Sequence, residues 1–482
     1  MSHLRRVPSA AWICALIACL NAVCWSVITP PFQVPDEPSH FAYVQTLVEN
    51  GRLPTAGTMP SEEEQVALRD LDNKAVKWHP ENQPVTTQEE QLRLQHDLAG
   101  PLRRSGPGEA GVAASQPPLY YALQTIPYEL GSSGTILDRL ELMRLLSALM
   151  AGITALFAYL FVREALPGVA WAWTVGGLSV ALAPLLGFMS GAVNPDAMLY
   201  SVAAAVFYVL ARAFRSGLTR RLAVAIGVLI AVGLLTKLNF IGLIPGVIVG
   251  LVVLARRAAG TLGGAAYRSA ALAIAIPASL ACLYIVINVF SGHPGLGVVS
   301  SAIHLTGRGS VLSEISYIWQ FYLPRLPGMV SYFPGISTTR QIWFDKSVGQ
   351  YGWLDTSFPV WAENIALIPV ALLTILGIRE LITVRATLRR RIAEVAVYAL
   401  MGAGLIVLIG ADQYVQSLLK EGETYAEPRY LLPLLPLVGA ALALSARGAG
   451  RRWGPAAGTL IVVLFLAHDL FSQLQVISRF YG

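Results

Sequence analysis

Long apolar runs alternate with short polar connections along most of this chain. Runs of about 20 apolar residues are long enough to cross a bilayer as helices. About eleven segments meet that criterion, and the two that flank Lys237 nearly touch and could form one broken helix. The predicted spans cover residues 10–29, 140–162, 168–189, 196–214, 221–237, 239–255, 268–290, 361–383, 393–411, 430–446 and 454–472.

Two longer segments, residues 30–138 and 291–360, interrupt this pattern. Loops of this length are uncommon unless they have a function. Within the first segment the sequence predicts short helices at residues 39–50, 62–72, 88–98 and 117–130. The last of these has an aromatic and apolar face suited to a helix that lies along the membrane interface. We therefore expect a transmembrane module over residues 1–290 and a variable transmembrane module over residues 291–482.

The composition agrees with an all-α integral membrane protein. Hydrophobic residues make up 55% of the chain and charged residues 13%, whereas soluble domains carry about 25% charged residues. The four cysteines all lie in apolar runs and form no Cys-x-x-Cys pair or disulfide framework. The net charge of +6 reflects membrane topology and anionic lipid rather than binding to nucleic acid.

Basic residues in short loops predict the orientation, because cytoplasmic loops are enriched in lysine and arginine. With about eleven spans, all the basic clusters fall on one side. The N-terminus is then cytoplasmic, and residues 30–138 lie outside the cytoplasmic membrane of a bacterium. The clusters include Arg5, Arg6, Arg212, Arg215, Arg220, Arg221, Arg256, Arg257, Arg379, Arg389, Arg390, Arg447, Arg451 and Arg452.

The segment PFQVPDEP at residues 31–38 directly follows the first predicted span. Its prolines end the helix and stiffen the exit, since proline lacks a backbone donor and restricts the residue before it. Asp36 and Glu37 are thus held at the membrane surface, where carboxylates are costly and often functional. A solvated acidic loop is the alternative. His40 could be a hydrogen-bonding group, or could join both carboxylates in binding a divalent ion such as Mg²⁺ or Mn²⁺.

Other unusual polar residues map to the same predicted side. Asn194 and Asp196 form the turn before the fourth span, where they could also simply cap a helix. Lys237 ends the fifth span and could instead extend its ammonium to the interface. Arg429 and Tyr430 open the tenth span, and an arginine on the outer side opposes the usual bias. The sequence therefore predicts one polar site outside the membrane.

This set suits sugar transfer from a lipid-phosphate donor. A carboxylate can accept the proton of an attacking hydroxyl as a general base, while lysine and arginine can stabilise a phosphate leaving group. We expect Asp36 to be the base and Glu37 to orient the acceptor, the base or an ion. Repulsion between neighbouring carboxylates would raise the proton affinity of one. The chain has no phosphate-binding loop motif for a nucleotide.

Four short motifs carry a resemblance to known proteins: Pro-Asp-Glu-x-x-His at 35–40, Gln-Pro-Pro-Leu-Tyr-Tyr at 116–121, Asn-Pro-Asp at 194–196 and Arg-Tyr-Leu-Leu-Pro at 429–433. Together they resemble GT-C-type membrane glycosyltransferases, most of all a bacterial family of predicted membrane proteins. Protein mannosyltransferases and aminoarabinose transferases are more distantly similar and share the Pro-Pro-Leu-Tyr-Tyr theme.

The resemblance implies a polyprenyl-phosphate sugar donor, inversion at the transferred sugar and a catalytic carboxylate in the first outer loop. It places catalysis on Asp36 or Glu37 and, more loosely, phosphate or donor contact on Lys237 and Arg429. The further residues expected to bind substrate or donor are His40, Tyr120, Asn194, Asp196 and Tyr430. We expect a hexosyl- or pentosyltransferase whose acceptor is a cell-envelope glycan, lipid or protein. A transporter or flippase of envelope lipids or polysaccharide precursors is the alternative, although it should carry its charges at mid-membrane on broken helices.

Overall fold

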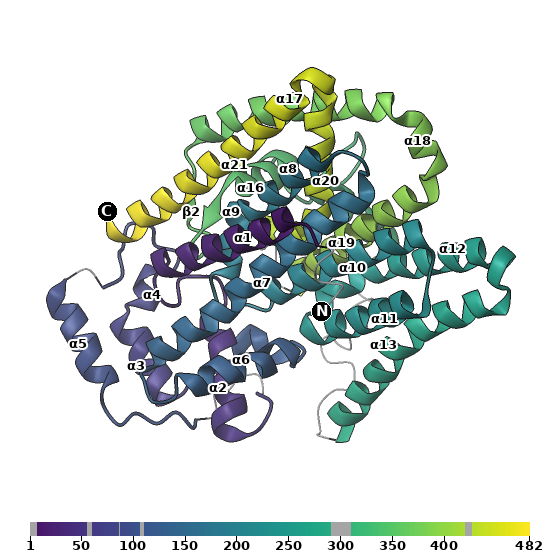
Figure 1. Ribbon diagram of the computed structural model, residues 1–482. Coiled ribbons are helices and arrows are strands. Elements are labelled where there is room, and N and C mark those ends of the chain that lie inside the picture. Colours follow the sequence, from purple (N-terminus) through teal and green to yellow (C-terminus); the bar gives the residue numbers. More distant parts are fainter. Residues whose placement is uncertain (1–6, 55–59, 86, 107–109, 291–309, 420–426) are drawn as a thin grey trace.

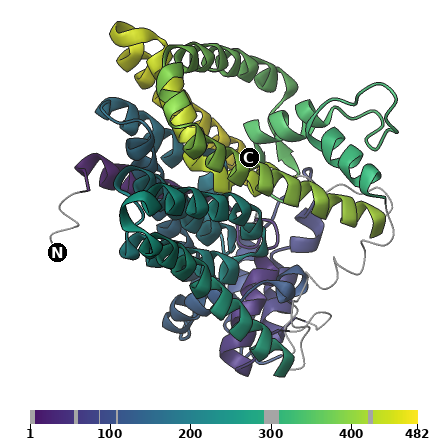
Figure 2. The same cartoon turned by 90° about the vertical axis from the view of Figure 1, so that its right-hand side faces the viewer.

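A computed structural model describes residues 7–54, 60–85, 87–106, 110–290, 310–419 and 427–482 (Figures 1 and 2). The described chain is helical apart from one two-stranded antiparallel hairpin, β1 (Gln350–Tyr351) and β2 (Thr356–Ser357). Its long helices are α1 (Ser9–Ile28), α7 (Ile136–Ala165), α8 (Ala170–Ala181), α10 (Asp196–Ser216), α11 (Arg220–Thr236), α12 (Ile244–Leu262), α13 (Gly264–Phe290), α17 (Val360–Thr383), α19 (Ile392–Leu419), α20 (Leu435–Gly448) and α21 (Gly450–Tyr481).

The prediction of an all-α membrane protein with about eleven spans is confirmed. Within the described residues nine helices are long and apolar enough to cross a membrane. A tenth span is the bent pair of α8 and α9 (Pro184–Ser190), whose axes differ by 51°. Helix α11 has 17 residues, at the lower limit for a span, and accounts for the remaining predicted segment. The segments flanking Lys237 form two helices joined by a 3₁₀ turn, η3 (Leu238–Leu243).

Helices α7 and α10 form the centre of the molecule. They pack against each other, and α1 and α8 lie against α7. In the most apolar window of α10, 83% of the residues are buried, compared with 6% for α17. Helix α17 therefore exposes most of its apolar surface, as a helix facing lipid would. Helices α8 and α20 approach closely at two glycines, since a Cβ on Gly176 would lie 2.7 Å from the Gly439 carbonyl oxygen.

The long first loop folds into a layer of short helices against one end of the spans (Figure 1). The predicted helices are confirmed, although the second ends two residues early and continues as a separate turn. Helix α5 begins with a capping box, in which Thr87 and Glu90 satisfy each other's backbone amides. The elements are α2 (Glu37–Asn50), α3 (Glu62–Asp70), α4 (Asn73–Val76), α5 (Gln88–Leu98), η2 (Gly111–Ser115) and α6 (Leu119–Leu130).

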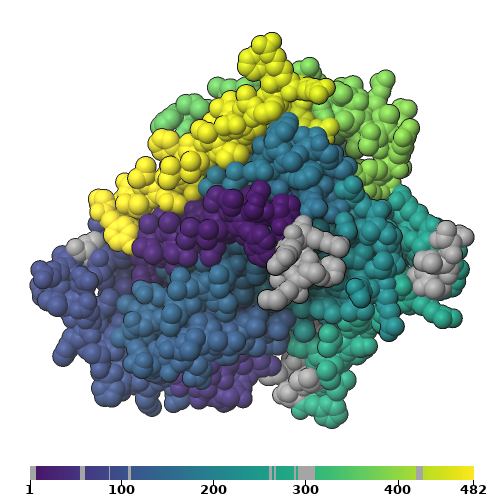
Figure 3. Space-filling view, viewed as in Figure 1, coloured from purple at the N-terminus to yellow at the C-terminus, as the bar shows by residue number. Residues whose placement is uncertain are grey.

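The second long segment lies partly outside the described residues, which resume at residue 310. It contains α15 (Val311–Tyr322), the π-helical turn η4 (Thr338–Asp345), α16 (Lys346–Val348) and the β1–β2 hairpin. The hairpin reaches the first loop, because the indole of Trp353 donates a hydrogen bond of 3.1 Å to the Phe32 carbonyl. Helix α21 runs beside α1 and ends next to the same loop (Figure 3). Segments distant in sequence thus meet around residues 29–38.

Candidate active site

Asp36 lies at the start of α2 in a left-handed backbone conformation, with φ of 66°. This conformation is uncommon for residues other than glycine, although aspartate adopts it more readily than most. The turn directs the side chain away from the helix, and the carboxylate makes no capping bond to α2. Instead, its Oδ2 atom lies 3.2 Å from Nη2 of Arg429, and one third of the side chain remains exposed. Asp36 is therefore ion-paired and still accessible.

Arg429 opens the 3₁₀ turn η5 (Pro428–Leu434) and joins two carboxylates. Its guanidinium contacts Asp36 and also forms a close ion pair with Glu427. The guanidinium carbon lies 5.3 Å from the centroid of the Tyr430 ring. Its Nη1 atom is buried and has no hydrogen-bond partner among the described residues. Because buried donors are normally satisfied by protein, water or a ligand, this atom can donate a further hydrogen bond.

A second buried ion pair joins two of the predicted residues. Nζ of Lys237 lies 2.7 Å from Oδ1 of Asp196, and the ammonium lies 5.8 Å from the Tyr430 ring centroid. The Oδ2 atom of Asp196 is buried without a hydrogen-bond partner in the described part of the chain. Asn194 accepts a hydrogen bond of 3.0 Å from the Asp196 amide. Asn194 thus caps the turn, whereas the Asp196 side chain faces the lysine.

Glu37 has surroundings unlike those of Asp36. Its Oε1 and Oε2 atoms accept hydrogen bonds of 2.8 and 2.6 Å from the guanidinium of Arg144 on α7. They also accept bonds from the amides of Val193 and Phe32, each of 3.0 Å. The glutamate side chain is fully buried. Arg144 further donates to the carbonyls of the α1 exit, at Ser26, Thr29 and Pro30. Glu37 therefore fastens the loop to α7 and has no oxygen free for a substrate.

His40 and Tyr120 lie in an aromatic cluster between α2 and α6. The Nδ1 atom of His40 is 2.9 Å from the Tyr121 hydroxyl, and the Tyr121 ring stacks on Tyr43. The Tyr120 hydroxyl pairs with Ser147 on α7 at 2.8 Å and accepts a bond from Gln124. Both predicted residues are buried. The hydroxyl of Tyr120 is thus fully engaged by Ser147 and Gln124, whereas His40 lies within electrostatic reach of Asp36 and uses Nδ1 for Tyr121.

The pKa values of three groups outside the spans are shifted in different directions. Burial alone would raise the pKa of Asp36, but the charges around it, Arg429 first among them, outweigh this and lower it. Burial lowers the pKa of His40 to about 3, so its imidazole is neutral at physiological pH. Burial also raises the pKa of Glu427, against the opposing charge of Arg429. The expectation that neighbouring carboxylates raise the proton affinity of the base does not hold for Asp36, because Arg144 neutralises Glu37 and Arg429 lies beside Asp36.

The three residues considered for a divalent ion do not converge. Glu37 is saturated by Arg144 and two amides, and the contacted nitrogen of His40 faces Tyr121. Within the residues that the structure describes, no group of three or more His, Cys, Asp or Glu side chains is arranged to hold a metal ion. The donors here do not fit Mg²⁺ or Mn²⁺, which favour several oxygen ligands.

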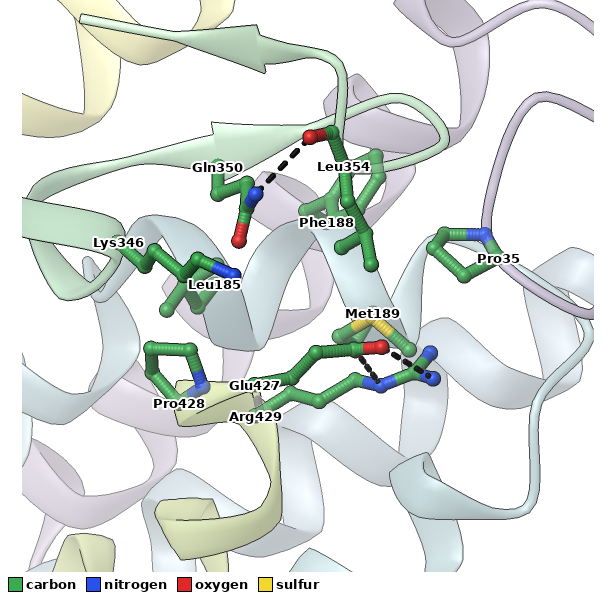
Figure 4. A pocket seen from close by; sticks show the side chains of 10 residues that line it. All are labelled: Pro35, Leu185, Phe188, Met189, Lys346, Gln350, Leu354, Glu427, Pro428 and Arg429. Carbon is green, nitrogen blue, oxygen red and sulfur yellow. Dashed lines mark hydrogen bonds and ion pairs between the residues drawn. The ribbon is translucent and has the colours of Figure 1, made fainter. Parts of the chain in front are cut away.

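A small pocket opens beside Arg429. Its walls are largely apolar, while Glu427 and Arg429 run side by side along one edge and the amine of Lys346 is directed into the same space (Figure 4). Sequence reasoning missed Lys346 and Glu427. The glutamate stands two residues before Arg429, and this proximity was the available signal. The apolar lining comprises Pro35, Leu185, Phe188, Met189, Leu354 and Pro428.

The charged residues gather at one end of the spans. Helix α10 contains 21 residues, from Asp196 to Ser216, and is about 30 Å long. At its far end Arg212 and Arg215 pair with Glu164 at the end of α7. About one hydrocarbon thickness therefore separates the candidate site from these basic residues.

These observations define a polytopic, all-helical membrane protein with a buried cluster of charges where several spans and loops meet. The model of one protein family, described as "Predicted membrane protein (DUF2142)", matches residues 19–438. The chain belongs to this family. No curated protein matches it.

Among solved structures, the chain is similar to an oligosaccharyltransferase from Archaeoglobus fulgidus. Three such structures are the apo form, the enzyme tethered to an acceptor peptide, and AglB in complex with an inhibitory peptide and a dolichol-phosphate. Sequence identity is 11–12% and the TM-score 0.43–0.44. The alignment covers 98% of this chain but 55–56% of those chains, so this chain spans about half their length. Likeness at this level is too low to assign a fold or an activity.

Proposed function

We propose that this protein is a GT-C-type glycosyltransferase that moves a sugar from a polyprenyl-phosphate donor to a cell-envelope acceptor. The observation that carries the proposal is the Asp36–Arg429 pair. An accessible carboxylate lies 3.2 Å from a guanidinium that retains one unsatisfied donor, beside a pocket with apolar walls. A base and a phosphate-binding cation are the two groups that the reaction requires.

In the proposed reaction, the hydroxyl oxygen of the acceptor bonds to the anomeric carbon of the donor sugar. The bond from that carbon to the phosphate oxygen breaks, and its electron pair leaves with the phosphate. Asp36 accepts the hydroxyl proton as general base. Attack opposite the leaving phosphate inverts the anomeric centre. Although burial raises the pKa of Asp36, Arg429 and the other nearby charges hold it below its ordinary value, so the carboxylate is ionised at neutral pH and can accept the proton.

The pocket matches an amphipathic donor. A polyprenyl-phosphate sugar has an anionic phosphodiester and an apolar chain, and the pocket supplies Arg429 and Lys346 for the first and side chains of α9 for the second (Figure 4). The phosphate would satisfy the unpaired Nη1 atom of Arg429. Lys237 is paired with Asp196, so in this scheme it contributes mainly to the local potential.

Donor binding would also prepare the base. Arg429 contacts Asp36 and Glu427, and the anionic phosphodiester of the donor competes for the same guanidinium. As Arg429 turns toward the phosphate, Asp36 loses its strongest opposing charge and becomes a better proton acceptor. The carboxylate would thus gain basicity when the donor is in place.

The site is proposed to face the outside of the cytoplasmic membrane. The basic pairs at the far end of α10 would then be cytoplasmic, in accordance with the usual bias. A reporter fused after Arg221 should score as cytoplasmic, and one inserted within residues 100–114 as external. The reverse result at either position would contradict this sidedness.

The direct test uses the purified full-length chain in nanodiscs with a panel of radiolabelled polyprenyl-phosphate hexoses and pentoses and a membrane extract as acceptor. We expect one donor to yield a labelled product and free polyprenyl phosphate in equal amounts. A transporter would instead move labelled lipid between leaflets without cleaving it. Translocation without cleavage of any donor would contradict the proposed transfer.

A further inference from the structure

Two tryptophans and a lysine form a cluster beside the candidate active site. Nζ of Lys77 lies 3.6 Å from the Trp353 ring centroid and 4.3 Å from that of Trp78. The two indoles meet edge to face, with centroids 6.3 Å apart. Trp353 is buried, whereas Trp78 is 61% exposed. A cation held between two indoles is favourable. This contact does not explain why the Trp78 ring is exposed to solvent.

The backbone of Trp78 is unusual as well. Its φ is 65°, a region that bulky residues rarely adopt and that costs free energy. Glycine or asparagine would occupy this turn more easily. A residue with a strained backbone and an exposed apolar ring contributes little to the free energy of folding. Such residues are concentrated at ligand sites, where the ring is used after folding.

Contacts from the far end of the chain hold this turn in place. Arg479, near the end of α21, donates a hydrogen bond of 2.9 Å to the His79 carbonyl and lies 3.6 Å from the Asp355 carboxylate. It thereby ties the Trp78 turn to the hairpin that carries Trp353. In Figure 1 the C-terminal end of α21 lies close to α4, which directly precedes the cluster. The position of the exposed indole is therefore built by three segments.

The cluster also connects to the catalytic loop. Trp353 donates to the carbonyl of Phe32, four residues before Asp36, and its neighbour Leu354 lines the pocket. Lys77 lies within electrostatic reach of Asp36. Asp36 thus interacts with Arg429, His40 and Lys237, and its charge also reaches Lys77. In the proposed function Arg429 binds the donor phosphate. The side of Asp36 that faces Lys77 and the two tryptophans is then left for the acceptor.

We propose that the Trp78–Lys77–Trp353 cluster is a carbohydrate subsite, in which a sugar ring of a glycan acceptor stacks on Trp78 and its hydroxyls bond to Lys77. The C–H face of a sugar is apolar and suits a flat indole, while its rim is polar. The residues that follow, His79, Pro80, Glu81, Asn82 and Gln83, are all exposed, which favours a surface facing water over one facing lipid. This inference rests on the proposed function, because it assigns the acceptor to the glycans.

Binding can be measured without catalysis. The full-length protein in nanodiscs is titrated with hexasaccharides of glucose, mannose, galactose, arabinose and N-acetylglucosamine, and saturation-transfer NMR reports the contact. We expect at least one hexasaccharide to bind, Trp78→Ala to weaken that binding about tenfold or more, and Trp78→Phe to recover part of it. Trp453→Ala is the matched control, since Trp453 is 62% exposed and lies beside Arg452.

The variant Asp36→Asn separates this inference from the proposed reaction. It should bind the glycan as the wild type does. Glycan binding that depends on Trp78, without sugar transfer from any donor, would support the subsite and contradict the proposed enzyme. Sugar transfer without such binding would support the enzyme and contradict the subsite. Absence of Trp78-dependent binding to every glycan would overturn the subsite. The subsite would also be overturned if brominated lipid quenched the fluorescence of Trp78 and Trp78→Ala left glycan binding unchanged. Trp78 would then be a membrane anchor.

Discussion

Two carboxylates that are neighbours in sequence enter two different ion-pair networks. Glu37 is fully buried, and its oxygens are taken by Arg144 and two backbone amides. Asp36 is one third exposed and shares a guanidinium that still has an unpaired donor. The first network is complete and the second is not. A complete buried network fixes structure, whereas an incomplete one beside a pocket has capacity left for a ligand.

The backbone produces this difference. The left-handed conformation at Asp36 turns its side chain away from that of Glu37, which begins α2. With the exit of α1 bound to Arg144 through three carbonyls, the loop has little freedom to exchange the two residues. The predictions that follow test whether the two networks have separate roles.

The largest effect is expected at the base. Asp36→Asn keeps the shape and removes the basicity, so turnover should fall by about a hundredfold or more, with the melting temperature nearly unchanged. Turnover is measured with the radiolabelled donor. Asp72→Asn is a matched control, since Asp72 also precedes a helix in the left-handed conformation, and it should remain active. Full activity in Asp36→Asn would remove the catalytic role from this loop.

Arg144→Met should act on stability instead. It leaves Glu37 buried without its charge partner, which typically costs about 3–5 kcal/mol. We expect a markedly lower melting temperature in detergent, measured by intrinsic fluorescence. Arg103→Met removes an exposed pair with Glu62 and should change stability by about 1 kcal/mol or less. Equal melting temperatures for the two variants would show that the Glu37 network is dispensable.

Arg429→Ala should weaken donor affinity, because each lost charge-assisted hydrogen bond contributes about 1.5–3 kcal/mol. Arg429→Lys should recover only a part, since a single ammonium cannot replace the two-pronged guanidinium. Arg447→Ala, on the opposite end of the same segment and paired with Glu380, is the control. Binding of the unreactive polyprenyl phosphate is the measurement. Unchanged affinity in Arg429→Ala would place the phosphate elsewhere.

The smallest effect concerns pH. Asp36 acts as a base when deprotonated, and its pKa lies below the ordinary value of 3.8. The acid limb of kcat/KM, which reports the free enzyme, should therefore lie below the pH at which an ordinary aspartate titrates. In Arg429→Gln, burial would no longer be opposed by that charge, so the pKa should rise and the limb should move to higher pH. If the acid limb did not move in Arg429→Gln, it would not report the ionisation of Asp36.

Sequence patterns predicted the helical architecture and the positions of the short helices in the first loop, because apolar length and helix caps are local signals. The predicted topology also grouped residues 36, 196, 237 and 429, and in the structure Asp36 pairs with Arg429 and Asp196 with Lys237. The partner of Glu37 could not be predicted. Arg144 lies inside an apolar run 107 positions away, and no local pattern connects the two. The exposed Trp78 was likewise invisible, since its exposure depends on a turn held by Arg479.

The most direct test is a structure determined by electron microscopy of the Asp36→Asn protein in nanodiscs with polyprenyl phosphate bound. The account predicts phosphate density within hydrogen-bonding distance of Arg429, apolar chain density along α9, and Glu37 still bound by Arg144. The contrary result is phosphate bound at another place while the guanidinium of Arg429 still contacts position 36 and Glu427. It would contradict the assignment of these residues to the active site.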